Sequence, residues 1–164
     1  MGAMAQSPPA RLDRTDLTIL RELQNDGRLS NLDLSKRRNL SATPCLNRVK
    51  RLERDGFITG YGAFVDPEKL DAALMVFVEI VLDRTTEHVF EEFKRAISDI
   101  PEIVECHMLS GGFDYLIKAR VRDMAAYREF LGTSLVSLPI VRESHTYVVM
   151  EEVKCTTAIP IHVT

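Results

Sequence analysis

An internal repeat in the C-terminal part of the chain restricts its fold more than any other sequence feature. Ile100-Pro101-Glu102-Ile103-Val104 recurs as Leu138-Pro139-Ile140-Val141, 38 positions later. Apolar, β-branched runs alternate with helical spacing of apolar residues around this repeat. The expected strands are 74–82, 103–109, 115–121 and 144–150, and the expected helices are 88–96 and 124–135. The resulting β-α-β-β-α-β order predicts a ferredoxin-like antiparallel sheet with both helices on one face.

Both expected helices cover one face of this sheet, so no further element of the chain remains to cover the opposite face. A sheet that is apolar on both faces must bury the second face against another layer. We therefore expect the chain to form dimers through the sheet.

The first sixty residues predict three short helices with N-terminal caps. Asp13 is expected to cap the first helix, with Asp16 at its N3 position. Ser30 and Ser41 are expected to cap the second and third helices. Asn39 stands at the end of the second helix, where the left-handed conformation is favoured. Two short helices around a tight turn are typical of a helix-turn-helix.

The third helix has two chemically different faces. At 100° per residue, Cys45, Val49 and Leu52 share one face and should pack on the other helices. The opposite face carries polar and basic side chains that suit a DNA major groove, since Arg and Lys pair with guanine and Asn pairs with adenine. These residues are Thr43, Asn47, Lys50, Arg51 and Arg54.

Further DNA contacts are expected beside this face. The second helix supplies Lys36, Arg37 and Arg38, placed to hold phosphates, and Ser41 begins the third helix. Arg48 lies on the flank, where a phosphate contact and a structural ion pair are equally compatible with the pattern. Residues 1–60 carry 11 Lys and Arg against 7 Asp and Glu, whereas residues 61–164 carry 10 against 17. This asymmetry is typical of an N-terminal part that binds a polyanion, although a solvated basic helix face explains the excess of basic residues equally well.

The composition and the positions of turn-forming residues suggest two domains in one chain. We expect a tail at 1–11, a helix-turn-helix domain at 12–62, a hinge at 63–73 and a ferredoxin-like effector-binding and oligomerisation domain at 74–164. Met1-Gly2-Ala3-Met4 is typical of an expression scar. No apolar run has the roughly 20 residues of a membrane span, and no secretory signal is visible. Cys45, Cys106 and Cys155 are scattered, which argues against a disulfide framework and a metal site. The expected compartment is the cytoplasm, in association with the nucleoid.

Ser110-Gly111-Gly112-Phe113-Asp114-Tyr115 joins the two halves of the repeat. Backbone N–H groups near Gly111 are suited to hold a carboxylate, and Asp114 an ammonium. The competing interpretation is a hairpin turn in which Asp114 caps backbone N–H groups. Both interpretations remain open at the level of sequence.

Four motifs run along nearly the whole chain from Leu12 to Lys154. They are Leu12-Asp13-x-x-Asp16-x-x-Ile19-Leu20, Ala42-Thr43-Pro44-Cys45-x-x-Arg48-Val49-x-x-Leu52-Glu53-x-x-Gly56-Phe57-Ile58, Gly111-x-x-Asp114-Tyr115-Leu116 and Thr146-Tyr147-Val148-Val149-Met150-Glu151-Glu152-Val153-Lys154. In this combination the chain resembles the Lrp/AsnC (feast/famine) family of transcription regulators, and within it the leucine-responsive branch.

The resemblance implies a winged helix-turn-helix that binds double-stranded DNA and a βαββαβ domain that pairs into dimers. It also implies assembly of dimers, commonly into octamers, and an amino-acid effector bound at the contacts between dimers. The positions that match the family's response site are Met108, Gly111, Asp114, Tyr115, Met124, Tyr147, Val148 and Val149. Most are apolar, which favours leucine or another branched-chain amino acid. No catalytic residue, cofactor or metal is expected.

Three other functions are compatible with parts of the sequence. An enzyme resembling a sirohaem decarboxylase would need histidines converging on a large pocket, but His88, His107, His145 and His162 are scattered. A small-molecule-binding module would use the helix-turn-helix only for assembly, and a nucleoid-organising protein would bind DNA with little sequence preference. The basic face of the third helix favours the regulator.

Overall fold

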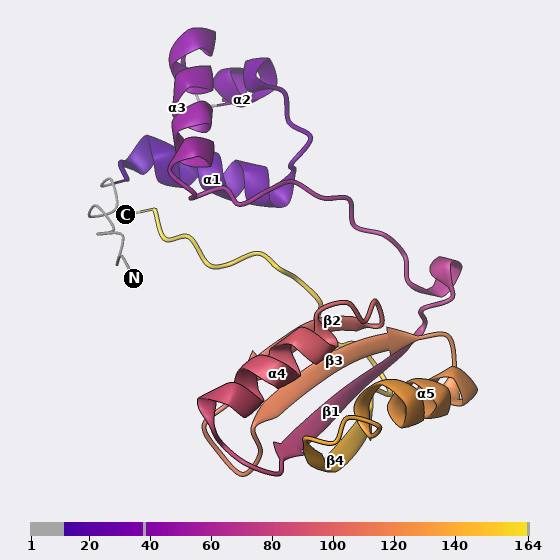
Figure 1. Ribbon diagram of the computed structural model, residues 1–164. Coiled ribbons are helices and arrows are strands. Elements are labelled where there is room, and N and C mark those ends of the chain that lie inside the picture. Colours follow the sequence, from indigo (N-terminus) through magenta and orange to yellow (C-terminus); the bar gives the residue numbers. More distant parts are fainter. Residues whose placement is uncertain (1–11, 38, 164) are drawn as a thin grey trace. The chain divides into compact units, whose positions relative to one another are not determined.

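The computed structural model describes residues 12–37 and 39–163, so the expected tail at 1–11 and Arg38 lie outside the described residues. The chain divides into two compact units. The N-terminal unit comprises the residues up to Phe64 together with the last segment from Cys155, and the C-terminal unit comprises Val65–Lys154. Figure 1 shows a group of helices in the first and a helix-covered sheet in the second.

Three helices form the N-terminal unit: α1 (Arg14–Asn25), α2 (Asn31–Arg37) and α3 (Ala42–Arg54). The predicted capping box of α1 is confirmed. The Asp16 backbone N–H donates to the Asp13 carboxylate over 2.8 Å, and the Asp13 N–H donates to the Asp16 carboxylate over 3.0 Å. The helices enclose a core of Ile19, Leu34, Cys45, Val49 and Leu52. Cys45, Val49 and Leu52 thus face inward, as their spacing predicts.

The predicted turn between α2 and α3 is partly confirmed. The Ser30 hydroxyl accepts the Asp33 N–H over 3.1 Å at the start of α2. Asn39 adopts the left-handed conformation, with φ of 50°. Ser41 occupies the N-cap position of α3, but its side chain makes no capping hydrogen bond. The prediction that its hydroxyl caps the helix is therefore wrong, and that hydroxyl is exposed for other contacts.

Gly56 ends α3 in a way that requires glycine. Its φ is 77°, and the Phe57 N–H donates back to the Leu52 carbonyl over 2.9 Å. This arrangement closes the last turn of the helix with a left-handed residue, which a side chain would strain. The following segment, residues 57–65, contains no strand.

The C-terminal unit has the predicted βαββαβ order. Its elements are β1 (Leu74–Leu82), α4 (Glu87–Ile97), β2 (Ile103–Met108), β3 (Tyr115–Val121), α5 (Met124–Phe130) and β4 (Val141–Val148). The antiparallel sheet has the order β2-β3-β1-β4, with β1 between β3 and β4. Figure 1 shows α4 and α5 on the same face of this sheet. The ferredoxin-like prediction is confirmed.

Alternate residues of the strands build the core beneath the two helices. Val76, Val78, Ile80 and Leu82 of β1 are buried there with Phe93 of α4 and Phe130 of α5. The opposite face of the sheet carries Phe77, which pairs laterally with Lys118 of β3 and Tyr147 of β4. Tyr147 is 53% exposed, so within one chain this face remains open.

Two predicted elements of the C-terminal unit have different bounds in the structure. The expected helix 124–135 is regular only to Phe130 and continues as one π-helical turn, η2 (Leu131–Leu135). The expected strand 144–150 begins and ends earlier, as β4. The hinge expected at 63–73 contains a short 3-10 helix, η1 (Glu68–Leu70).

Candidate nucleic-acid interface and effector site

The outward face of α3 presents a stripe of polar and basic side chains. Thr43, Asn47, Lys50 and Arg54 are all exposed and recur at helical spacing. The buried residues Cys45, Val49 and Leu52 fix the opposite face against the core. An α-helix fits a B-form major groove, where Asn and Lys side chains can reach base edges. The stripe therefore has the geometry and the chemistry of a recognition surface.

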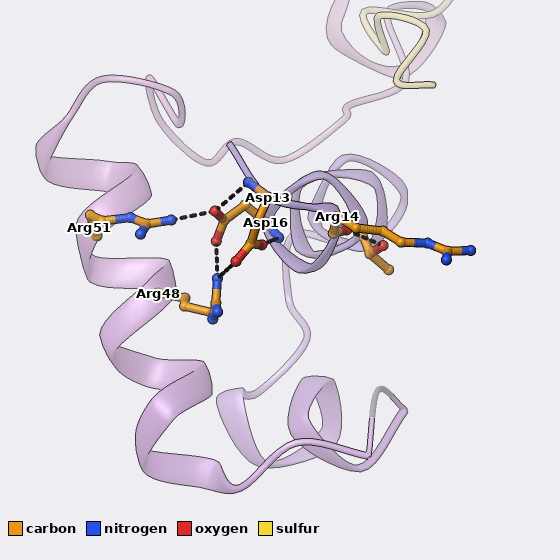
Figure 2. A network of polar contacts seen from close by, with 6 residues as sticks. Asp13, Arg14, Asp16, Arg48 and Arg51 are labelled. Carbon is orange, nitrogen blue, oxygen red and sulfur yellow. Dashed lines mark hydrogen bonds and ion pairs between the residues drawn. The ribbon is translucent and has the colours of Figure 1, made fainter. Parts of the chain in front are cut away.

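Two further arginines of α3 contact α1, in a network shown in Figure 2. Arg48 donates to Asp13 over 2.6 Å and to Asp16 over 2.8 Å, and Arg51 forms an ion pair with Asp16. The Asp16 side chain is only 1% exposed, whereas those of Arg48 and Arg51 are 31% and 37% exposed. The sequence left a phosphate contact and a structural ion pair open for Arg48, and the structure contains the ion pair. Arg51 is likewise engaged with α1, a contact that its place on the polar face did not predict.

The network favours the charged forms of its members. The Asp16 backbone N–H, and then the Arg48 guanidinium, lower the pKa of the Asp13 carboxyl. The hydrogen bonds from Arg48 to the two carboxylates raise the pKa of that guanidinium. Because charged partners also orient one another, the network fixes α3 against the start of α1.

The remaining predicted phosphate contacts come from α2. Lys36 is exposed at the end of this helix. Arg37 is 53% exposed and forms an ion pair with Glu22 of α1 over 3.1 Å. Arg37 is thus held near α1, and its exposed surface faces solvent.

Asp114 ties the β2–β3 hairpin to β1. Its carboxylate accepts the Leu82 backbone N–H over 2.8 Å, and its own N–H donates to the Ile80 carbonyl over 2.9 Å. Capping of backbone groups, one of the two interpretations of this residue, is therefore present. The bond from the Leu82 N–H uses only one oxygen of the Asp114 carboxylate, Oδ2.

The hairpin borders an open hollow of about 520 Å³. Its walls include the loop after β1, the start of β4 and the two glycines of the hairpin. A Cβ atom at Gly111 or Gly112 would meet nothing within 4 Å, and neither residue has a left-handed φ. The single chain therefore does not require glycine at either position.

Met108 and Tyr115 line a second hollow of about 420 Å³, together with residues of α4 and β2. The Tyr115 ring packs on Phe93 with centroids 4.5 Å apart. Its hydroxyl is buried without a hydrogen-bond partner among the described residues. Burial raises the pKa of the neighbouring Cys106 thiol to about 11, so this thiol is protonated at neutral pH.

The other predicted effector residues lie at the opposite end of the sheet. Val149 donates its N–H to the carbonyl of Met75, at the beginning of β1, whereas Asp114 is bound to Ile80, near its end. Met75 and Ile80 are five residue steps apart, which corresponds to about 17 Å of strand. At the end of the sheet where β1 begins, three side chains are about half exposed: Met124, Tyr147 and Val148. We name these groups the hairpin cluster (Met108, Gly111, Asp114, Tyr115) and the strand-end cluster (Met124, Tyr147, Val148, Val149).

The described part of the chain lacks two features that are typical of other classes of protein. None of its helices is both long and apolar enough to cross a membrane. No three His, Cys, Asp or Glu side chains in this part gather in a way that suits a metal ion.

Comparison with known proteins assigns both units to families. Residues 12–59 match the winged helix-turn-helix DNA-binding model, and residues 75–159 match the Lrp/AsnC ligand binding domain. The leucine-responsive regulatory protein of Escherichia coli strain K12 is 60% identical to this chain over 147 residues, which is 90% of each protein.

Solved structures match the whole architecture. A transcriptional regulator of Neisseria meningitidis, crystallised as a complex with L-methionine, superposes with a TM-score of 0.87 at 37% identity, over 92% of this chain and 97% of its own. An AsnC family transcriptional regulator of Agrobacterium tumefaciens gives a TM-score of 0.86 at 37% identity, over 91% and 97%.

Proposed function

This chain belongs to the Lrp/AsnC family of DNA-binding transcription regulators, and from that premise we propose that leucine or another branched-chain amino acid controls its assembly and DNA binding. The family is one of regulators rather than enzymes, and its C-terminal domain binds amino acids.

The DNA-reading surface in this proposal is the exposed stripe of α3. Asn47 and Lys50 lie at its centre and contact base edges, with Thr43 and Arg54 at its ends. Lys36, Arg37 and Ser41 hold phosphates on either side. Arg48 acts by fixing α3 to α1. Arg51 reads bases only with the part of its guanidinium that Asp16 leaves accessible.

The separation of the hairpin cluster from the strand-end cluster carries the proposal for the effector site. An amino acid the size of leucine cannot contact both ends of β1, which lie about 17 Å apart between the two anchoring residues. We therefore place each effector between two copies of the chain, one supplying the hairpin cluster and the other the strand-end cluster. Such a site is complete only in an assembly of dimers, and we propose an octamer.

The chemistry of the two clusters favours an apolar amino acid. Backbone N–H groups around Gly111 take the carboxylate, and the Asp114 oxygen that does not bind Leu82 takes the ammonium. Met108, Met124, Val148 and Val149 surround the side chain. The name of the 60% identical relative supports leucine, and the methionine complex of the Neisseria regulator supports an aliphatic side chain of similar size.

Dimerisation in this proposal uses the open face of the sheet. Phe77 and Tyr147 supply apolar surface there, flanked by Lys118. Two such faces form a sandwich that hides the surface that one chain leaves open.

Sedimentation velocity with each of the twenty amino acids tests the proposal. A ligand that bridges two copies must shift the association equilibrium, because it binds one assembly state better than the other. We expect leucine, isoleucine or valine to cause the largest shift, and aspartate and lysine to cause none. If no amino acid alters the distribution, the effector proposal fails.

A further inference from the structure

The last described segment of the chain, which we name the C-terminal tail (residues 155–163), belongs to the N-terminal unit. Its anchor is Gln24 of α1. The Gln24 side-chain oxygen accepts the Ile159 backbone N–H over 2.9 Å, and the Gln24 amide nitrogen donates to the Ile159 carbonyl over 3.0 Å. One side-chain amide thus satisfies both backbone groups of one tail residue, as a neighbouring β-strand would.

Arg21 extends this contact by one step along the helix and along the tail. Its guanidinium donates to the Ile161 carbonyl over 2.7 Å. Residues three apart on a helix are surface neighbours, about 5–6 Å between Cβ atoms. Alternate residues of an extended chain lie about 6–7 Å apart. Arg21 and Gln24 therefore match the repeat of an extended backbone, and Ile161 is half-buried where it lies.

We propose that the outer face of α1 is a docking surface for the C-terminal tail, and that the docked tail is a second covalent link between the effector-binding and DNA-binding units. The first link is the connector between α3 and β1. The second begins at Val149, whose N–H is fixed to the Met75 carbonyl over 3.0 Å, and ends at Ile159. The two anchors are ten residue steps apart, so the tether spans at most about 36 Å.

The second link limits the freedom of the DNA-binding unit. A unit held at two points samples fewer orientations, which raises its effective concentration at a second half-site once the first is bound. The link also starts at the strand-end cluster, so a ligand contact at Val148 or Val149 acts on the segment that ends on α1. This last step rests on the proposed function, whereas the docking itself does not.

Hydrogen–deuterium exchange of the full-length chain without amino acid tests the docking. Arg21→Ala or Gln24→Ala removes bonds that hold the tail, so peptides covering 155–164 should exchange on the order of tenfold faster. Arg14→Ala is the matched control, because it removes an exposed arginine of the same helix whose side chain points away from the network in Figure 2. Equal exchange in all four proteins would overturn the docking.

Removal of the tail tests the link. A chain that ends after Lys154 should bind DNA with two half-sites several-fold more weakly than the full chain, but DNA with one half-site equally well. Loss of affinity for both DNAs in parallel, or for neither, would overturn the second link. Neither experiment contains an effector, so their outcome is separate from that of the amino-acid screen.

Discussion

The buried carboxylate of Asp16 on α1 accepts a hydrogen bond of 2.8 Å from the guanidinium of Arg48 on α3. The same carboxylate accepts the Asp13 backbone N–H and pairs with Arg51 (Figure 2). The start of α1 and the orientation of α3 therefore depend on one side chain. This dependence matters for function because the exposed stripe of α3 can contact base edges only if the helix enters the groove in the correct orientation.

Asp16→Ala should weaken this packing and loosen α3. It removes a capping bond, the carboxylate partner of Arg51 and one of the two carboxylate partners of Arg48. Because both guanidinium groups are about one-third exposed, water offsets part of the loss. We expect the N-terminal unit to lose about 2–3 kcal/mol of stability. Urea unfolding monitored by amide exchange of α1 and α3 peptides measures this loss. Asp33→Ala removes the exposed carboxylate that accepts the Ser30 hydroxyl at the start of α2, and it should cost about 1 kcal/mol or less.

Asn47→Ala should cost base recognition without affecting the fold, since Asn47 is exposed on α3. We expect a loss of about 1–3 kcal/mol on a selected DNA site and almost none on random DNA. Salt-titrated gel shifts on both DNAs measure the difference. Lys36→Ala is the control for phosphate contacts and should weaken both DNAs equally, with a salt slope shallower by about one. Uniform losses in both variants would contradict base reading by Asn47.

The sequence predicts the sheet well because each strand has a local hydrophobic pattern that does not depend on the rest of the fold. The residue bounds of β1 and β3 agree with the prediction, since both are apolar, β-branched runs that end at loop residues. The end of α5 was mispredicted because periodicity does not distinguish an α-helix from the π-helical turn that follows Phe130.

The candidate site was predicted less well, because its geometry depends on contacts between elements. A helical wheel places Arg51 on the polar face of α3, but it does not reveal that the buried Asp16 of another helix lies within its reach. Likewise, Asp114 and Met124 are close in sequence, whereas strand register assigns them to opposite ends of β1. Distances of this kind follow only from the pairing of strands.

Lowering the pH should reduce the contribution of Asp13 to stability. The carboxyl has its pKa lowered by the Asp16 N–H and Arg48, from an ordinary value of 3.8. Its charged form therefore stabilises the folded state above about pH 4, and this stabilisation disappears as the pH falls through the lowered pKa. The difference in unfolding free energy between wild type and Asp13→Asn should be constant above pH 5 and shrink toward pH 2. A difference independent of pH would contradict this assignment.

Asp114→Asn should abolish the response to leucine and leave the hairpin intact. Asparagine keeps an oxygen that can accept the Leu82 N–H, so the hairpin remains tied to β1, but the negative charge that would bind an ammonium is lost. Sedimentation velocity should therefore find a variant that dimerises and does not shift with leucine. Gly112→Ala tests the hairpin fold alone and should change stability by less than about 0.5 kcal/mol, because its Cβ meets open space.

Mixed assemblies decide whether one effector site uses two copies of the chain. Met124→Glu places a carboxylate in the strand-end cluster, at a helix N-terminus that tolerates negative charge. Alone, Met124→Glu and Asp114→Asn should each be unresponsive. In an equal mixture refolded together, a site between two copies has an intact hairpin cluster in half of the cases and an intact strand-end cluster in half. About one quarter of the sites should then bind leucine, as measured by calorimetry. If both clusters had to come from one chain, every site would carry one defect and no binding would return.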